Sequence, residues 1–331
     1  MWTLEESRGH VRAAFEACRT SPANAEAVAD ALVRAEADGI PSHGLSRVPA
    51  NAAQALAGKV DGFAVPEVTR PMPGTVRIDA ATGFAYPALN AGLPVLAAAA
   101  GEQGLAAAAV ANSHHAGVLG HIVEDLAERG LIALAMSNSP AAIAPWGGRR
   151  ALFGTNPIAF AAPLPGRPPL VIDLSLSRVA RGKIMLAAGR GEPIPETWAF
   201  DADGAPTSDA KAALAGTMAP MGDAKGAQLV LIVELLATML TGANFGFQAS
   251  SMFDDKGGPP RLGQFILAMV PSGFGNPGAL AHAARLIAEI EGEVGARLPG
   301  SRRLAERRRL AREGISLDGA LASSILALSG R

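Results

Sequence analysis

Cysteine, aromatic side chains and net charge are all scarce in this sequence. The single cysteine, Cys18, cannot form a disulfide within the chain, which fits a reducing compartment, and we expect a cytoplasmic protein. The formal net charge is −1 at pH 7, so no overall field attracts nucleic acid or an anionic membrane. The arginine-rich stretch 297–312 has no aromatic residues between its charges, so base stacking is not expected either.

Long apolar runs and a leader sequence are missing too. The longest run, LVLIVELLATML, has Glu234 near its centre and is shorter than the ~20 apolar residues of a membrane-spanning helix, so it predicts a buried helix. The start, MWTLEESRGH, shows no basic segment followed by an apolar one, so we expect no signal peptide. A hydrophobic content of 49% over 331 residues predicts a globular protein with more than one lobe.

The order of patterns predicts an α/β protein. In SPANAEAVADALVRAEADG, Ser21 can cap a helix, Pro22 suits its first turn, and Gly39 can end it in the left-handed conformation. Helical patterns dominate both ends of the chain, and short apolar strands dominate the middle. We predict strands in TVRIDAATG, LAAAAVANS, LIALAMSNS, PLVIDLS and RLGQFILAMVP. The predicted parts are an N-terminal helical part (1–74), a cofactor-binding α/β domain (75–272) and a C-terminal helical part (273–331) that packs with the first.

The stretch DGIPSHGLSRVP concentrates reactive side chains. Ser42 can cap a short turn on which His43 and Arg47, four residues apart, share a face. A histidine exchanges protons near neutral pH, and an arginine grips a carboxylate with two parallel hydrogen bonds. The trio therefore suits a substrate with a carboxylate next to a carbonyl or an imine. The alternative is a helix cap, a half-buried spacer and a solvated surface charge.

Three further stretches are candidates for binding. In NSHHAGVLGHIVEDLAERG, the spacing of the histidines matches no usual zinc pattern, so we expect no metal; a strand, a glycine turn and a helix start suit an anion instead. GFGNPG is a literal GxGxxG, but no strand follows it, so we do not predict a Rossmann site. Arg297, Arg302 and Arg303 flank a Pro-Gly turn and could hold phosphates, including the extra phosphate of NADP; the alternative is a solvated helix face.

Several motifs together resemble one family. DGIPSHGLSRVP, SHHAG, PWGGRRALFGTNPIAFAAP, VIDLSLSRVARGKI and PMGDAKG, in this order, are similar to the malate/L-lactate dehydrogenase-like oxidoreductases. The resemblance implies their non-Rossmann α/β fold, with a largely antiparallel central sheet, a helical domain built from both termini, and a homodimer. GFAYPAL, VELLATMLTGANFGF and RLPGSRRLAERRR are most similar to the Δ1-piperideine-2-carboxylate/Δ1-pyrroline-2-carboxylate reductases of that family.

The resemblance also implies roles for residues. Ser42 and His43 match the acid–base pair, with His43 as the proton donor, and Lys183 stands at a third catalytic position. Arg47, Thr155 and Arg181 match substrate contacts. The implied cofactor contacts are His115, Ala116, Gly117, Val118, Leu119, Asp173, Leu174, Ser175, Lys225, Leu298, Pro299, Gly300, Ser301, Arg302, Arg303 and Leu304.

The implied activity is reduction of a cyclic imine carboxylate at C2 to proline or pipecolate, using NADPH, with NADH as an alternative. Arg181-Gly-Lys183 departs from the imine reductases, where AHGD is expected and its aspartate completes a relay with the serine and histidine. PMGDAKG is a second departure. The alternative activity is therefore a 2-hydroxy-acid dehydrogenase acting on malate, lactate or a diketo sugar acid. Either way the expected partner is a small carboxylate.

Overall fold

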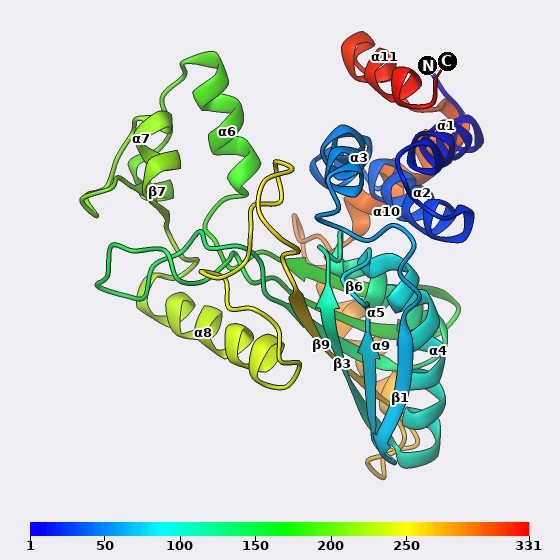
Figure 1. The fold of residues 1–331 in the computed structure, drawn as a ribbon. Helices are drawn as coiled ribbons and strands as arrows, with labels where there is room; N and C mark the ends of the chain where they lie inside the picture. Colours follow the sequence, from blue (N-terminus) through cyan, green and yellow to red (C-terminus); the bar gives the residue numbers. More distant parts are fainter. Residues whose placement is uncertain (331) are drawn as a thin grey trace.

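The computed structural model describes residues 1–330, which form a helical layer, a central sheet with its own helices, and a third lobe (Figure 1). Both ends of the chain build the helical layer, as predicted, and the termini lie close together. Trp2 pairs with Ile315 in a short antiparallel bridge, and Phe15, Leu32 and Ile325 share the core of this layer. Its helices are α1 (Leu4–Ala17), α2 (Pro22–Ala37), α3 (Val48–Leu56), α10 (Ser301–Glu313) and α11 (Gly319–Leu328).

Helix α2 begins and ends where the sequence predicts. The Ser21 hydroxyl accepts a hydrogen bond from the backbone N–H of Asn24, and Pro22 occupies the first turn. Asp38 follows the last helical residue, and Gly39 then adopts a φ of +71°, a conformation that glycine takes without strain. This sharp end directs the chain at once into the Ser42–Arg47 segment.

The central sheet has seven strands in the order β1-β2-β3-β9-β4-β5-β6. Among the described strands of this sheet, only β2 and β3 pair in parallel, so the prediction of a largely antiparallel sheet is confirmed. Strand β9, close to the end of the sheet-forming sequence, lies at its centre between β3 and β4. The strands are β1 (Glu67–Met72), β2 (Thr75–Asp79), β3 (Leu105–Ser113), β4 (Ile132–Ser137), β5 (Ile158–Leu164), β6 (Arg167–Leu174) and β9 (Leu262–Met269).

Helices from several parts of the chain cover the sheet. Helices α4 (Ala85–Gln103) and α5 (Leu119–Glu128) bury Leu96, Val123 and Leu126 in one core with the strands. Helix α9 (Ala279–Gly292) packs against β5 through Ile287 and Leu164. The third lobe holds η3 (Glu196–Trp198), α6 (Arg181–Arg190), α7 (Ala210–Ala215), α8 (Asp223–Met239) and the strand pair β7 (Ala199–Phe200) and β8 (Thr217–Met218).

The predicted part boundaries differ from this arrangement at two places. The boundary at residue 74 divides a hairpin, because Met72 of β1 pairs with Thr75 of β2, so the N-terminal part also supplies an edge strand. The C-terminal part is divided as well, because α9 packs on the sheet and only α10 and α11 join the helical layer. Among the described helices, none is both long and apolar enough to cross a bilayer.

Candidate active site

The segment after α2 brings the predicted trio together. It folds as two short 3₁₀ turns, η1 (Pro41–His43) and η2 (Leu45–Arg47). The Ser42 hydroxyl lies 3.1 Å from Nδ1 of His43, and the Arg47 Nε donates to the carbonyl oxygen of Ser42. The prediction that Ser42 caps a turn is wrong, because the residue lies inside η1 and its hydroxyl bonds the imidazole instead.

The imidazole of His43 is neutral at pH 7 in this structure. Desolvation, which is the largest cause, and the nearby positive charge of Arg47 together lower the pKa of His43 from 6.5 to about 4. The ring stacks loosely on His115, with 5.4 Å between the ring centroids. Burial lowers the pKa of His115 as well, so both rings are uncharged. When the Nδ1–H of the neutral ring donates to the Ser42 hydroxyl, Nε2 has a free lone pair and can accept a proton.

Arg47 has the character of an anion-binding group. Among residues 1–330, no carboxylate lies within 4.0 Å of its guanidinium, although desolvation lowers its pKa. Its guanidinium carbon lies 4.8 Å from the centroid of the Phe253 ring, which is a cation–π contact. A half-buried arginine without an acidic partner offers its fork of N–H donors to a carboxylate ligand.

The turn between β3 and α5 carries the predicted residues His115 to Leu119 to the same place. The backbone N–H of Gly117 donates to Nδ1 of His115, which fixes the ring beside His43. Gly117 has a φ of +69°, and a Cβ there would lie 2.8 Å from the hydroxyl of Tyr86. Glycine is therefore required both by the backbone conformation and by the tyrosine packed against it. Burial raises the pKa of Tyr86 to about 12.

A cavity of about 400 Å³ opens beside this turn. Its wall includes seven of the predicted cofactor contacts, from three separate stretches: Val118, Asp173, Leu298, Pro299, Gly300, Arg302 and Arg303. Oδ2 of Asp173 accepts the backbone N–H of Gly120, which joins β6 to the start of α5. Helices α5 and α10 both begin at this cavity, and Arg297 and Arg302 add positive charge. Helix starts and arginines suit a phosphate-bearing ligand, so the residues present fit a dinucleotide.

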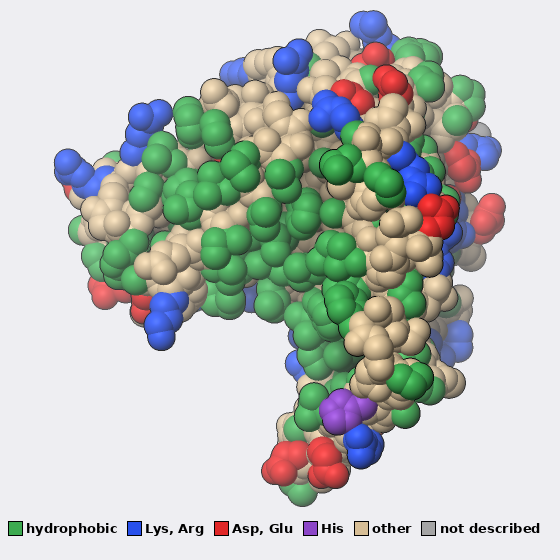
Figure 2. Space-filling model, turned by 90° about the horizontal axis from the view of Figure 1, so that it is seen from below, with side chains coloured by type: hydrophobic (Ala, Val, Ile, Leu, Met, Phe, Trp, Pro, Cys, Tyr) green, Lys and Arg blue, Asp and Glu red, His purple; other side chains and the backbone are tan. Residues whose placement is uncertain are grey.

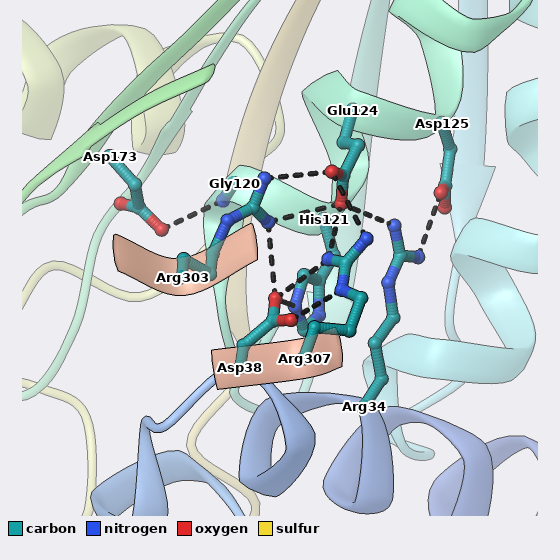
Figure 3. A network of polar contacts seen from close by, with 9 residues as sticks. All are labelled: Arg34, Asp38, Gly120, His121, Glu124, Asp125, Asp173, Arg303 and Arg307. Atoms are coloured by element: carbon teal, nitrogen blue, oxygen red, sulfur yellow. Dashed lines mark hydrogen bonds and ion pairs between the residues drawn. The ribbon is translucent and has the colours of Figure 1, made fainter. Parts of the chain in front are cut away.

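A buried ion-pair network lies next to the cavity (Figure 3). Asp38 accepts hydrogen bonds from His121 at 2.8 Å, Arg303 at 3.1 Å and Arg307 at 2.8 Å. Glu124 accepts from Arg34, Arg303 and Arg307 at 2.7–2.9 Å. Both carboxylates are at most 1% exposed. The network ties the end of α2, and so the Ser42–Arg47 segment, to α5 and to the first two turns of α10.

The arginines decide the charge state of this network. Burial alone would raise the pKa of Glu124, but hydrogen bonds and charges from Arg307 and Arg303 lower it to about 2. The pKa of Asp38 is likewise held well below its usual range by Arg307 and His121 against the effect of burial. Arg303 is thus occupied by two carboxylates, whereas Arg302 is exposed on the cavity wall. Of the three arginines predicted to hold phosphate, Arg297 and Arg302 are the two whose side chains are exposed on the cavity wall.

Other predicted residues lie on elements outside the Ser42–Arg47 segment and the β3–α5 turn. Thr155 precedes β5, where its N–H donates to the hydroxyl of Ser139. Arg181 and Lys183 begin α6 in the third lobe; within residues 1–330, no hydrogen bond or ion pair joins them to Ser42, His43 or Arg47. The other predicted contacts lie at the end of β6 (Leu174, Ser175), in the first turn of α8 (Lys225) and in the first turn of α10 (Ser301, Leu304).

Sequence reasoning missed several residues around the site. Asp38, Arg34 and Arg307 belong to the network, and Phe253 lies under Arg47. A partial signal was available, because the charged Asp38 directly follows the alanine-rich pattern that predicts a helix. For Phe253 no signal exists in the sequence, because its loop lies about two hundred positions from Arg47.

Comparison with known proteins identifies the family. The sequence profile described as malate/L-lactate dehydrogenase matches residues 2–326. The chain belongs to the malate/L-lactate dehydrogenase family. This confirms the predicted family, and with it the prediction of an oxidoreductase, since the relatives are named as dehydrogenases and reductases.

Three proteins to which this chain is similar are informative. The (2R)-3-sulfolactate dehydrogenase (NADP(+)) of Chromohalobacter salexigens is 52% identical over 310 residues, which are 93% of this chain and 92% of the relative. The Δ1-pyrroline-2-carboxylate/Δ1-piperideine-2-carboxylate reductase of Pseudomonas aeruginosa is 42% identical over 98% of each chain. The crystal structure of Δ1-piperideine-2-carboxylate reductase from Pseudomonas syringae pv. tomato has a TM-score of 0.93 at 38% identity, over 99% of each chain.

Proposed function

We propose that the protein transfers hydride between NADP(H) and C2 of a small 2-hydroxy or 2-oxo acid, with 3-sulfolactate and 3-sulfopyruvate as the first candidates. The observation that carries this proposal is the pairing of the neutral imidazole of His43 with Arg47, whose guanidinium has no carboxylate within 4.0 Å among residues 1–330. A bound nicotinamide supplies or accepts the hydride. The chain then has to hold the acid, orient its C2, and move one proton.

The trio divides these tasks. Arg47 grips the substrate carboxylate, which places the neighbouring carbon beside His43. In the oxidising direction the neutral His43 accepts the hydroxyl proton, and in the reducing direction it returns that proton to the oxygen. Ser42 holds Nδ1 of His43, so the other ring nitrogen faces the substrate. These roles are the proposed catalytic functions of Ser42 and His43.

Two observations favour the oxo acid over the cyclic imine. The relative that is 52% identical is named as a sulfolactate dehydrogenase. Lys183 stands where an imine reductase is expected to have an aspartate. Reduction of a ketone needs a proton for the product oxygen, whereas an iminium substrate already carries the proton on its nitrogen. The low pKa of His43 suits an alcohol substrate, because the base is ready at neutral pH.

Cyclic imine reduction is the second candidate. It is supported by the 42% identity to a pyrroline/piperideine-2-carboxylate reductase and by the close structural match to another. The same Arg47 and His43 geometry serves a ring carboxylate. The cofactor proposal is common to both candidates: Arg302, exposed on the cavity wall, binds the 2′-phosphate of NADPH.

The test is a panel of substrates with NADPH and with NADH. The oxo acids are 3-sulfopyruvate, oxaloacetate and pyruvate, and the imines are Δ1-pyrroline-2-carboxylate and Δ1-piperideine-2-carboxylate. We expect the highest kcat/KM with 3-sulfopyruvate and NADPH. Turnover of the imines with none of the oxo acids would reverse the order of the two candidates. Cofactor binding without turnover of any of the five would reject both.

The assembly is proposed to be a homodimer. Figure 2 shows hydrophobic side chains gathered over the face that includes α8, and Leu231, Ile232, Leu235 and Met239 of α8 are 42–67% exposed. Apolar faces of this kind in a chain of near-zero net charge favour a second copy over a charged partner. Light scattering at micromolar concentration should give twice the chain mass, and Ile232→Glu should give the monomer. A wild-type monomer would contradict the proposal.

A further inference from the structure

Lys59, which follows α3, is completely buried although it is a lysine. Its ammonium donates to the backbone carbonyl oxygens of Ser251 at 2.6 Å, Asp254 at 2.9 Å and Lys256 at 2.6 Å. An ammonium has three N–H donors, and this one therefore has a carbonyl acceptor for each. The Asp254 carboxylate, 3.5 Å away, adds the opposite charge that a buried cation requires.

These acceptors all belong to one loop, residues 251–256, that passes between α3 and the third lobe (Figure 1). A second buried side chain, Gln54 of α3, donates to the carbonyl oxygen of Met252 in the same loop and bonds His114 next to the site. The loop's own side chains accept hydrogen bonds inside it, from the N–H of Phe253 and of Lys256, so within residues 1–330 the hydrogen bonds that hold it to the rest of the protein come from Lys59 and Gln54. Phe253 projects from it onto Arg47.

We infer that Lys59 is a positioning residue for substrate binding: it fixes loop 251–256 and so holds the Phe253 ring against the guanidinium of Arg47. The ring limits the directions in which the Arg47 side chain can turn, so the N–H fork is ready for a carboxylate before the substrate arrives. This inference rests on the proposed role of Arg47. Neither Lys59 nor Phe253 bonds the reacting atoms.

The test compares Lys59→Met, which keeps the apolar stem and removes the three donors, with Phe253→Leu. The matched control is Lys211→Met, at an exposed position of α7. Oxalate, an unreactive dianion, is titrated by calorimetry into enzyme saturated with NADPH. We expect both site variants to lose about tenfold in oxalate affinity, the scale of a partly desolvated cation–π contact. NADPH affinity should stay within about twofold of wild type, and the control should lose nothing.

A purely structural role for Lys59 predicts something different. In that case Lys59→Met has a lower melting temperature than the wild type, but the folded variant binds oxalate with unchanged affinity. That result would overturn the inference. The double variant should lose no more affinity than either single variant, because both act through the same ring. Additive losses would also overturn it. If Lys59→Met does not fold, Phe253→Leu decides: unchanged oxalate affinity rejects the route through the ring.

A readout without any substrate separates this inference from the proposed function. Trypsin can cut after the exposed Lys256, and the fixed loop should resist it in the wild type. We expect mass spectrometry to show faster cutting there in Lys59→Met than in Lys211→Met. If the wild type does not bind oxalate but Lys59→Met is still cut faster than Lys211→Met, the role of Arg47 is rejected. The fixing of loop 251–256 by Lys59 is then kept. Equal rates of cutting in both variants reject the fixing of loop 251–256 by Lys59.

Discussion

The protonation of His43 yields a quantitative prediction. Its pKa is lowered from 6.5 to about 4, first by desolvation and then by the charge of Arg47. The pH dependence of kcat/KM reports groups of the free enzyme, so oxidation of the hydroxy acid should rise with pH through an inflection near 4 and then level off. At about pH 5.5 nearly all of the imidazole is neutral, whereas a histidine of ordinary pKa would be neutral in only about a tenth of molecules.

The assay is the initial rate of NADPH formation from the hydroxy acid at low substrate concentration, across a series of buffers of constant ionic strength. We expect kcat/KM at about pH 5.5 to be close to its value at pH 7. The inflection of kcat should lie higher than that of kcat/KM, because a bound carboxylate offsets the Arg47 charge beside His43. Ser42→Ala, the control, should lower the plateau. An inflection of kcat/KM near 6.5, or an unchanged rate in His43→Ala, would reject the role of His43 as a base that is neutral at about pH 5.5.

Three further predictions concern the network and the cavity. Asp38→Asn should lower the free energy of unfolding in urea by about 3–5 kcal/mol, as expected when a buried ion pair loses one partner, whereas Asp125→Asn, at a carboxylate that is 35% exposed, should cost less than about 1 kcal/mol. Glu124 has a folded-state pKa of about 2 against 4.5 ordinarily, so its stabilisation is present above 4.5 and is lost as the pH falls towards 2; Glu124→Gln should show a smaller loss across that window. Arg302→Ala should weaken NADPH binding, followed by fluorescence, at least about tenfold more than NADH binding, and equal effects on both would remove the assignment of the 2′-phosphate.

The sequence predicted those features of the fold that depend on residues close together in the chain. Ser21, Pro22 and Gly39 delimit α2 because caps and left-handed glycines act within a few residues. Ser42 and His43 meet because they are neighbours, whatever turn they adopt. The helix cap predicted at Ser42 is wrong because a proline and a glycine restrict the segment to 3₁₀ turns. The strand patterns predicted β9, but its place between β3 and β4 depends on pairing that no local pattern contains.

Contacts between residues far apart in the chain could not be predicted from the sequence, for a physical reason. Arg303 and Asp38 are 265 positions apart, and an arginine in a helix looks the same whether it meets a phosphate, a carboxylate or water. The burial of Lys59 could not be predicted from the sequence either, because its partners are backbone carbonyl oxygens, which every residue has. The antiparallel sheet came from the resemblance to a family, and the family match over residues 2–326 supports that source.

The transfer of the hydride itself tests the proposed reaction. The enzyme is given 3-sulfopyruvate and NADPH deuterated at C4, on each face of the ring in turn, and the product is analysed by mass spectrometry and NMR. We expect one deuterium at C2 of sulfolactate from one of the two labelled cofactors, and a severe loss of this transfer in both His43→Ala and Arg47→Ala. Full transfer in both variants, or no deuterium at C2 of any acid in the panel, would contradict the proposal.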